Sequence, residues 1–177
     1  MPFLRNPHLD LTTSRIETSR CVIVPFSTDG RVDIRELQEE FCLANKNLWI
    51  APVLPNYKEE MEFVTDIIDL ISRWEVFENW IIEKWTNRLI GAIALNTPEE
   101  YRMNIGLWIR ESEQGKWYGT EAYTAILDWA RKNTIYNHLK HSTNEENTGS
   151  NKLALKFDGM LQDERSDRGH LICHIPL

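Results

Sequence analysis

The sequence predicts an α/β (α+β) fold in which a mostly antiparallel sheet is flanked by helices. Three apolar runs, at 79–85, 88–95 and 103–110, follow one another with short links, which is typical of an antiparallel meander. A loop with two glycines comes next, and the run after it has apolar residues at three- and four-residue spacing. The meander therefore leads through a glycine loop into a helix, and the other elements are arranged around this centre.

Length, charge and cysteine content limit the class of protein. The chain has 177 residues, and we expect an N-terminal arm at 1–15 and a single domain at 16–177. Twenty basic and 27 acidic residues give a net charge of −7, which argues against a nucleic-acid partner and suits a cationic substrate. Three scattered cysteines, no secretory h-region and no membrane-length apolar run predict a cytoplasmic protein without a membrane partner.

Four elements are expected before the meander. Residues 16–26 read as a strand ending near Pro25, and 33–44 as a helix with one apolar stripe. The apolar loop 47–55 either packs into the core or lines a pocket. Asn56 and Glu59 resemble a capping box and predict the start of a second helix, whose acidic residues form a solvated face or an amine site.

The meander and the central helix follow. A turn at Thr86 and Asn87 joins the first two strands, and 96–102 is expected to be a connection. After the loop, Ala122, Ile126 and Ala130 predict the buried face of the helix. The start of a helix presents unpaired N–H groups and a positive dipole end, so this loop either binds phosphate or is an ordinary turn.

The last third of the chain reads as strand, helix and strand. His138 and His141 would point to opposite faces of a strand at 135–143, which argues against a metal site. His141 is then either a proton-transfer group or an ordinary strand histidine. Ser150 is expected to cap a helix that runs to about Asp158 and ends at Gly159, and 170–175 is the last strand.

Two motifs resemble those of the GNAT acetyltransferases, in particular the RimJ/RimL branch. The run 115–122, GKWYGTEA, is similar to motif A, and the run from Asn147 through Ser150 is similar to motif B. The opening strand, with Arg20, also resembles that of the branch. The chain departs from the family pattern near the site: Trp117 replaces a glycine, Ala154 a common tyrosine acid and Asn104 a common glutamate base. Gly159 arrives one position late, and Cys21, Val24 and Met160 also differ from the commoner residues.

The resemblance implies a fold, a reaction and a set of site residues. It implies a central mixed, twisted sheet of six to seven strands with a V-shaped splay between two parallel strands. The implied function is an N-acetyltransferase that uses acetyl-CoA as co-substrate, without a metal, and acetylates a primary amine of a small molecule or protein N-terminus by direct attack. A non-catalytic acyl-CoA-binding or regulatory protein is the alternative, and a homodimer is left open.

The site residues implied by the resemblance fall into three groups. Strand residues would hold the pantetheine arm, loop residues the pyrophosphate, and Asn147 the cofactor from the second strand. Ser150 would lie beside the thioester sulfur as the acid, and Glu83 or a water would be the base. The strand and loop residues are Trp108, Ile109, Arg110, Gln114, Gly115, Lys116, Trp117, Tyr118, Gly119 and Thr120.

Overall fold

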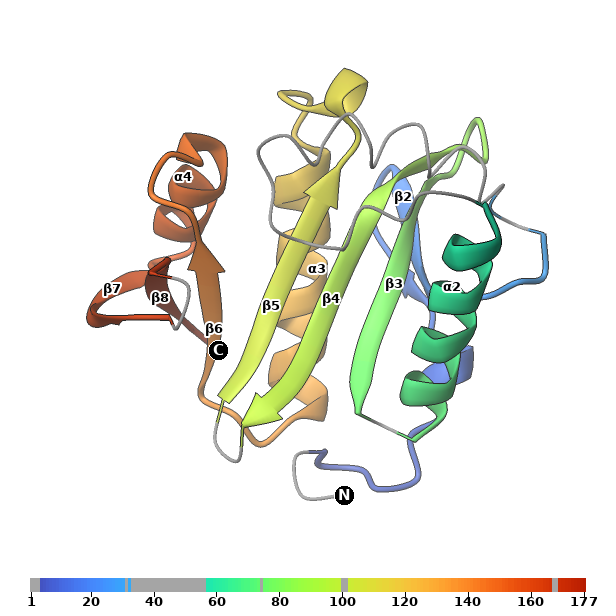
Figure 1. Cartoon of the computed structure of the whole chain (residues 1–177), viewed down its shortest axis with the longest axis horizontal. Coiled ribbons are helices and arrows are strands. Elements are labelled where there is room, and N and C mark those ends of the chain that lie inside the picture. Colours follow the sequence, from blue (N-terminus) through green and yellow to red (C-terminus); the bar gives the residue numbers. More distant parts are fainter. Residues whose placement is uncertain (1–3, 31, 33–56, 74, 100–101, 167–168) are drawn as a thin grey trace.

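The computed structural model describes residues 4–30, 32, 57–73, 75–99, 102–166 and 169–177 (Figure 1). The expected helix at 33–44, the apolar loop at 47–55 and the cap at Asn56 lie outside these residues. Within the described part of the chain, no helix is both long and apolar enough to span a membrane.

In the described part of the chain, eight strands form one sheet in the order β1-β2-β3-β4-β5-β6-β8-β7, and only β5 and β6 among them are parallel. The predicted class is confirmed, with eight strands in place of six or seven. The run at 16–26 divides into two short strands, and β7, which has no apolar alternation, adds an edge. The strands are β1 (Ile16–Glu17), β2 (Cys21–Pro25), β3 (Val76–Glu83), β4 (Leu89–Glu99), β5 (Arg102–Ile109), β6 (His138–Thr143), β7 (Met160–Arg165) and β8 (Leu171–Pro176).

The expected connection at 96–102 is wrong, because β4 extends to Glu99 and β5 begins at Arg102. Asn96 pairs with Asn104, and Glu99 pairs with Arg102 at the end of the hairpin. These residues are polar and show no apolar period, so backbone pairing alone extends the strands. In contrast, β6 begins only at His138, and Ile135 is exposed.

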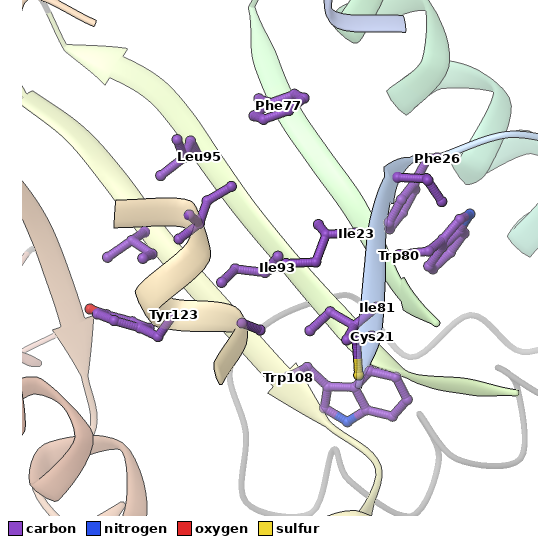
Figure 2. Packing of buried hydrophobic residues seen from close by; sticks show 14 of the residues in the cluster. Cys21, Ile23, Phe26, Phe77, Trp80, Ile81, Ile93, Leu95, Trp108 and Tyr123 are labelled. Carbon is purple, nitrogen blue, oxygen red and sulfur yellow. The ribbon is translucent and has the colours of Figure 1, made fainter. Parts of the chain in front are cut away.

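Helices cover both faces of the sheet (Figure 1). Helix α3 (Tyr118–Asn133) packs behind β4 and β5, and α2 (Tyr57–Ser72) lies beside β3 on the other side. Phe77 of β3 stacks on Trp129 of α3 with ring centroids 4.4 Å apart, and Ile23 and Ile93 fill the same layer (Figure 2). The predicted buried face of α3 is therefore confirmed.

The other helical segments among the described residues are short: η1 (Leu11–Thr13), η2 (Glu111–Glu113) and α4 (Thr148–Lys156). The segment expected to be an arm packs on the domain. Leu11 is in the core, and Leu4 forms a bridge with Thr134 next to the end of α3.

The parallel strands β5 and β6 diverge, as the V-shaped splay requires. They pair only between Met103–Ile105 and Leu139–His141. β5 continues to Ile109 without pairing to β6, whereas β6 continues paired to β8 as far as Thr143. The outer edge of β5 beyond Ile105 is consequently left without a neighbouring strand.

Candidate functional site

The loop before α3 carries a run of unpaired main-chain donors. The first helical hydrogen bond runs from the N–H of Glu121 to the carbonyl of Trp117, at 3.0 Å. Among the described residues, none accepts a hydrogen bond from the N–H groups between Gly115 and Thr120. These donors lie at the positive end of the helix dipole, so the arrangement suits a phosphate group.

Trp117, at the position where the resembled motif has a glycine, takes a backbone conformation that glycine favours. Its φ of 70° and ψ of 3° are in the left-handed region, which costs a residue with a Cβ about 1–2 kcal/mol. The indole is 67% exposed, and Nζ of Lys156 lies 4.1 Å from its centroid. The tryptophan therefore keeps a main-chain N–H in the loop, and its ring packs outward against Lys156 of α4.

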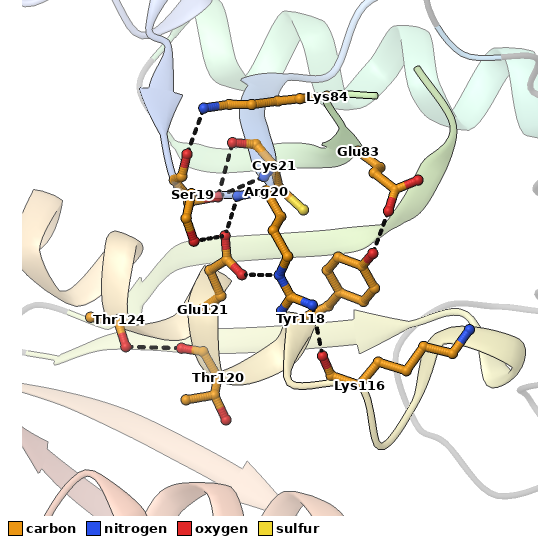
Figure 3. Close-up of polar contacts among 11 residues, drawn as sticks. Ser19, Arg20, Cys21, Glu83, Lys84, Lys116, Tyr118, Thr120, Glu121 and Thr124 are labelled. Atoms are coloured by element: carbon orange, nitrogen blue, oxygen red, sulfur yellow. Dashed lines mark hydrogen bonds and ion pairs between the residues drawn. The ribbon is translucent and has the colours of Figure 1, made fainter. Parts of the chain in front are cut away.

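A network of hydrogen bonds from Arg20 and Glu121 holds this loop from behind (Figure 3). Arg20 donates from its backbone N–H and its Nε to the carboxylate of Glu121, at 2.7 and 2.8 Å, and its Nη1 donates to the carbonyl of Lys116 at 3.0 Å. Burial works against ionisation of Glu121, but hydrogen bonds from Thr18 and Arg20 lower its pKa to about 2. These residues anchor β2 to the start of α3 and act as structural supports for the anion site.

Side chains of the predicted loop residues are largely engaged elsewhere. Gln114 closes the loop, because its N–H donates to the carbonyl of Glu111 and its Nε2 donates to the carbonyl of Ile109 at 2.9 Å. Lys116 pairs with Glu113 at 3.0 Å, and the hydroxyl of Tyr118 donates to Glu83. The candidate anion site therefore consists of main-chain N–H groups and begins at Gly115.

At the end of β5, alternate residues present their main chain to the splay. The N–H of Arg110 donates to Ile90 of β4, and the carbonyl of Trp108 points at Gly91, where an added Cβ would lie only 2.1 Å away. The N–H and C=O groups of successive residues point to opposite edges of a strand, so the main-chain groups of Leu107 and Ile109 point to the splay. Of the three predicted strand residues only Ile109 faces it, and Leu107 was missed because the sequence does not reveal which residues bond to β4.

The start of α4 is capped by Asn147, which corrects the prediction that Ser150 is the cap. Oδ1 of Asn147 accepts from the backbone N–H of Ser150 at 3.1 Å, which is the usual bond from an N-cap to the third helical residue. The helix ends at Lys156, before the predicted Asp158. Asp158 takes the left-handed position with φ 58°, and Gly159 is needed because a Cβ there would lie 2.6 Å from the carbonyl of Ala154.

With its capping role excluded, the hydroxyl of Ser150 is free to take part in a different contact. Nε2 of His141 lies 2.8 Å from this hydroxyl, and Nδ1 of His141 lies 3.0 Å from the hydroxyl of Tyr123. His141 is only 4% exposed, and burial lowers its pKa to about 4. The histidine that the sequence left open is therefore neutral and in contact with the predicted catalytic serine.

On the opposite face of the sheet, Glu78 is a carboxylate that sequence reasoning missed. Phe77 points to α3, so Glu78 points away from it, beside the small residues Ala94 and Gly106 with which it is in register. The described residues provide no hydrogen bond or ion pair to it, and burial raises its pKa to about 7. A lone glutamate inside the apolar run 76–82 was the available sequence signal.

Glu83, the base suggested from the sequence, lies at the far end of β3 in a different environment. It accepts from the hydroxyl of Thr86 at 2.6 Å and from the hydroxyl of Tyr118. These two bonds lower the pKa of Glu83, and the bond to Glu83 raises the pKa of Tyr118 to about 12. The structure therefore places Glu83 in the support of the loop, away from Ser150.

Comparison with known proteins agrees with this geometry. Residues 20–159 match the family model of the acetyltransferase (GNAT) domain. An uncharacterized N-acetyltransferase, p20 of Bacillus licheniformis, is 24% identical over 157 residues, which cover 80% of this chain and 88% of the relative. The chain belongs to the GNAT acetyltransferase family.

Solved structures with the same fold include two that contain a coenzyme. RimL, a ribosomal L7/L12 α-N-protein acetyltransferase solved with coenzyme A, has a TM-score of 0.76 at 16% identity, over 91% of this chain and 96% of that one. MccE, a microcin C7 self-immunity acetyltransferase solved with acetyl-CoA and AMP, has a TM-score of 0.73 at 17% identity, over 90% and 93%. At these identities, the likeness concerns the fold.

Proposed function

We propose that this protein transfers the acetyl group of acetyl-CoA to a primary amine, by direct attack in a ternary complex. The observation that carries the proposal is the run of open N–H groups from Gly115 to Thr120, which lies at the C-terminal end of β5, beside the splay. Six consecutive donors at a helix N-terminus suit a diphosphate better than they suit a neutral ligand.

The residues around the splay fit the remaining parts of the coenzyme. The main-chain groups of Leu107 and the N–H of Ile109 would bond to the amides of the pantetheine arm, as an added strand does at a sheet edge. The side-chain nitrogen of Asn147 remains available to the cofactor, because its cap uses only the oxygen. The hydroxyl of Ser150 would lie next to the sulfur.

The two faces of the sheet have separate roles in this proposal. His141 and Ser150 lie on the face of α3, whereas Glu78 and Asn104 lie on the other face. The strands that carry Asn104 and His141, β5 and β6, separate just beyond Ile105. Acetyl-CoA supplies a thioester carbonyl at this opening. An amine bound on the face of Glu78 would attack the thioester carbonyl at this opening. Holding the two reactants next to each other in this way supplies much of the rate enhancement.

Glu78 is the residue we propose as the base. A group with a pKa near 7 combines a useful ionised fraction with the ability to hold a proton. Glu83, already bonded to Thr86 and Tyr118, is a weaker base than an ordinary glutamate. Glu78 therefore replaces Glu83 as the first candidate, with a water between it and the amine where the reach requires one.

The far face also favours an amine as the acceptor. The amide oxygens of Asn96 and Asn104 are buried and have no donor among the described residues. These two oxygens and the carboxylate of Glu78 offer hydrogen-bond acceptors, and a protonated amine offers up to three donors. This set suits a protein N-terminal amine, as in the RimJ/RimL branch, or a small amine, and it agrees with the net charge of −7.

The direct test is turnover with a panel of N-terminal peptides and polyamines, with release of the coenzyme thiol as the readout. Glu78→Gln should lower kcat at pH 7 by roughly 10- to 100-fold, because a positioned base contributes about 10²–10⁴. The exposed Glu75→Gln is the matched control. Coenzyme binding without turnover on any amine would favour the non-catalytic alternative.

Stability against pH provides an independent check on Glu78. Its folded pKa of about 7 exceeds the ordinary value of 4.5, so its contribution is complete below pH 4.5 and is lost as pH rises to about 7. Glu78→Gln should therefore raise the free energy of unfolding at pH 8 by about 1–3 kcal/mol and leave it nearly unchanged at pH 4. An equal change in unfolding free energy at pH 4 and pH 8 would contradict the raised pKa of Glu78.

A further inference from the structure

Three polar side chains from three elements form a buried chain of hydrogen bonds that ends at the proposed site. Tyr123 comes from α3, His141 from β6 and Ser150 from α4, and the two contacts are 3.0 and 2.8 Å long. Tyr123 and His141 are buried, and within the described residues the tyrosine hydroxyl has no partner besides His141. The chain connects the core to the hydroxyl of Ser150.

The count of protons fixes the direction of both bonds. If Nδ1 of His141 carried the proton and donated it, the hydroxyl proton of Tyr123 would be buried without an acceptor, at a cost of about 1–3 kcal/mol. Tyr123 therefore donates to Nδ1, and the proton of the neutral imidazole is on Nε2. Nε2–H then donates to Oγ of Ser150, which leaves the proton of Ser150 free for another acceptor.

We propose that Tyr123 and His141 are positioning residues, which fix the hydroxyl of Ser150 as a hydrogen-bond donor toward the splay. The proposal rests on the proposed function, because the acceptor there is the sulfur of the departing coenzyme. Without the bond from His141, the serine hydroxyl could turn its own proton to the imidazole and leave the sulfur without a donor.

Ser150 then stabilises the developing thiolate without giving up its proton. Complete transfer along the chain would remove a proton from Tyr123 in the core, and burial raises the pKa of that phenol well above its usual value. In the overall step the nitrogen–carbon bond forms, the carbon–sulfur bond breaks, and the amine proton passes to Glu78. The thiolate takes its proton from solvent.

The tautomer of His141 tests the chain without any turnover. We would record nitrogen NMR spectra of the full chain, labelled at histidine, and assign the signals with His141→Gln. The expected result is a neutral ring protonated at Nε2 from pH 6 to 8, with a change in the Nδ1 chemical shift in Tyr123→Phe, because that nitrogen loses its hydrogen-bond donor. A charged ring, or an Nδ1–H ring in the unchanged protein, would overturn the proposal.

Kinetics separate positioning from a general loss of structure. Tyr123→Phe should lower kcat by roughly 3- to 10-fold, the worth of about one hydrogen bond, and leave KM for acetyl-CoA unchanged. The same substitution in a Ser150→Ala background should have no further effect on kcat, since the hydroxyl to be positioned is gone. Tyr136→Phe is the control for loss of a partly buried tyrosine hydroxyl.

The outcomes distinguish the two proposals. An equal loss from Tyr123→Phe with and without Ser150 would mean that the tyrosine acts through the fold, and would overturn the positioning role. If no amine is acetylated at all, the proposed function fails, whereas the NMR result still decides whether His141 donates to Ser150.

Discussion

Two helix N-termini flank the splay, and they are finished in opposite ways. The N-cap of α3 is Trp117, whose side chain makes no capping bond, and the N–H groups around it are open. The N-cap of α4 is Asn147, whose side chain satisfies the N–H of Ser150. Both helices point a positive dipole end outward, but only α3 keeps its donors for a ligand.

The difference shows that a helix N-terminus can serve two purposes in one fold. At α3 it offers free N–H groups to an anion, and at α4 it holds the hydroxyl of Ser150 in place. At α3, sixteen residues of helix and the brace from Arg20 stabilise an end that lacks a cap. At α4, only nine residues follow the cap, so a side chain must complete the first turn before Ser150 can be held in place. A helix N-terminus without a side-chain cap therefore requires stabilising contacts elsewhere. A capped N-terminus instead has the residues of its first turn held in place.

The largest expected effect concerns Ser150, at the capped N-terminus of α4. Ser150→Ala should lower kcat by about 10²-fold, the usual loss on removing one donor to a developing negative charge, with little change in coenzyme affinity. The peptide N–H of residue 150 still bonds to Asn147, so the helix should keep its start. Steady-state kinetics measure kcat, and calorimetric titration with coenzyme A measures the affinity. A weaker coenzyme complex with normal kcat would mean that Ser150 binds the coenzyme and does not assist the reaction.

The open end is tested by placing a charge on it. Thr120→Asp puts a carboxylate beside the free N–H groups, which should favour the helix by about 0.3–1 kcal/mol and compete with the diphosphate. Coenzyme affinity should fall roughly 10- to 100-fold while the melting temperature rises, a combination that a folding defect cannot produce. Thr124→Asp carries the same charge one turn further along, and a similar loss there would point to a general effect of charge.

Removing the cap should make the two ends more alike. Asn147→Ala leaves the N–H of Ser150 without its partner and should cost about 1 kcal/mol of unfolding free energy. Part of that cost is local fraying of α4, so kcat should fall more than coenzyme affinity does. Urea unfolding measures the first quantity, and Asn144→Ala, in the preceding turn, is the control. Unchanged stability would mean that the start of α4 is held by tertiary contacts alone.

The sequence predicted what depends on neighbours in the chain. The central helix, the glycine loop and the three strands of the meander follow from local spacing, and the GNAT resemblance supplied the splay between β5 and β6. The polar tip of the hairpin at 96–102 was missed because main-chain pairing leaves no pattern in the side chains. Local pattern also assigned the cap of α4 to Ser150, although Asn147 three residues earlier is an equally good capping residue.

Features that depend on distant contacts could not be predicted in this way. Nothing near His141 in the sequence indicates Tyr123 or Ser150 as its partners, since they come from different helices. The same holds for Glu78 and Glu83, two glutamates on one strand. Their opposite pKa shifts follow from burial of the first and from Thr86 and Tyr118 around the second.

The smallest expected effect concerns Trp117, the departure that most affects the open end. Trp117→Gly should release about 1 kcal/mol of left-handed strain and lose about 0.5–1 kcal/mol of contact with Lys156, so the free energy of unfolding should change little. Trp117→Ala loses the same contact and keeps the strain, so it should be less stable than the glycine variant by about 1 kcal/mol.

Coenzyme affinity should be nearly the same in the unchanged protein and both Trp117 variants, because all three keep the N–H at position 117. Lys156→Gln removes the cation from the ring and isolates that contact. A tenfold weaker coenzyme complex in both Trp117 variants, with the normal value in Lys156→Gln, would show that the indole itself binds the ligand. The coenzyme would then bind to the indole of Trp117 as well as to the N–H groups at the start of α3. The contrast with α4 would in that case depend less on the free N–H groups.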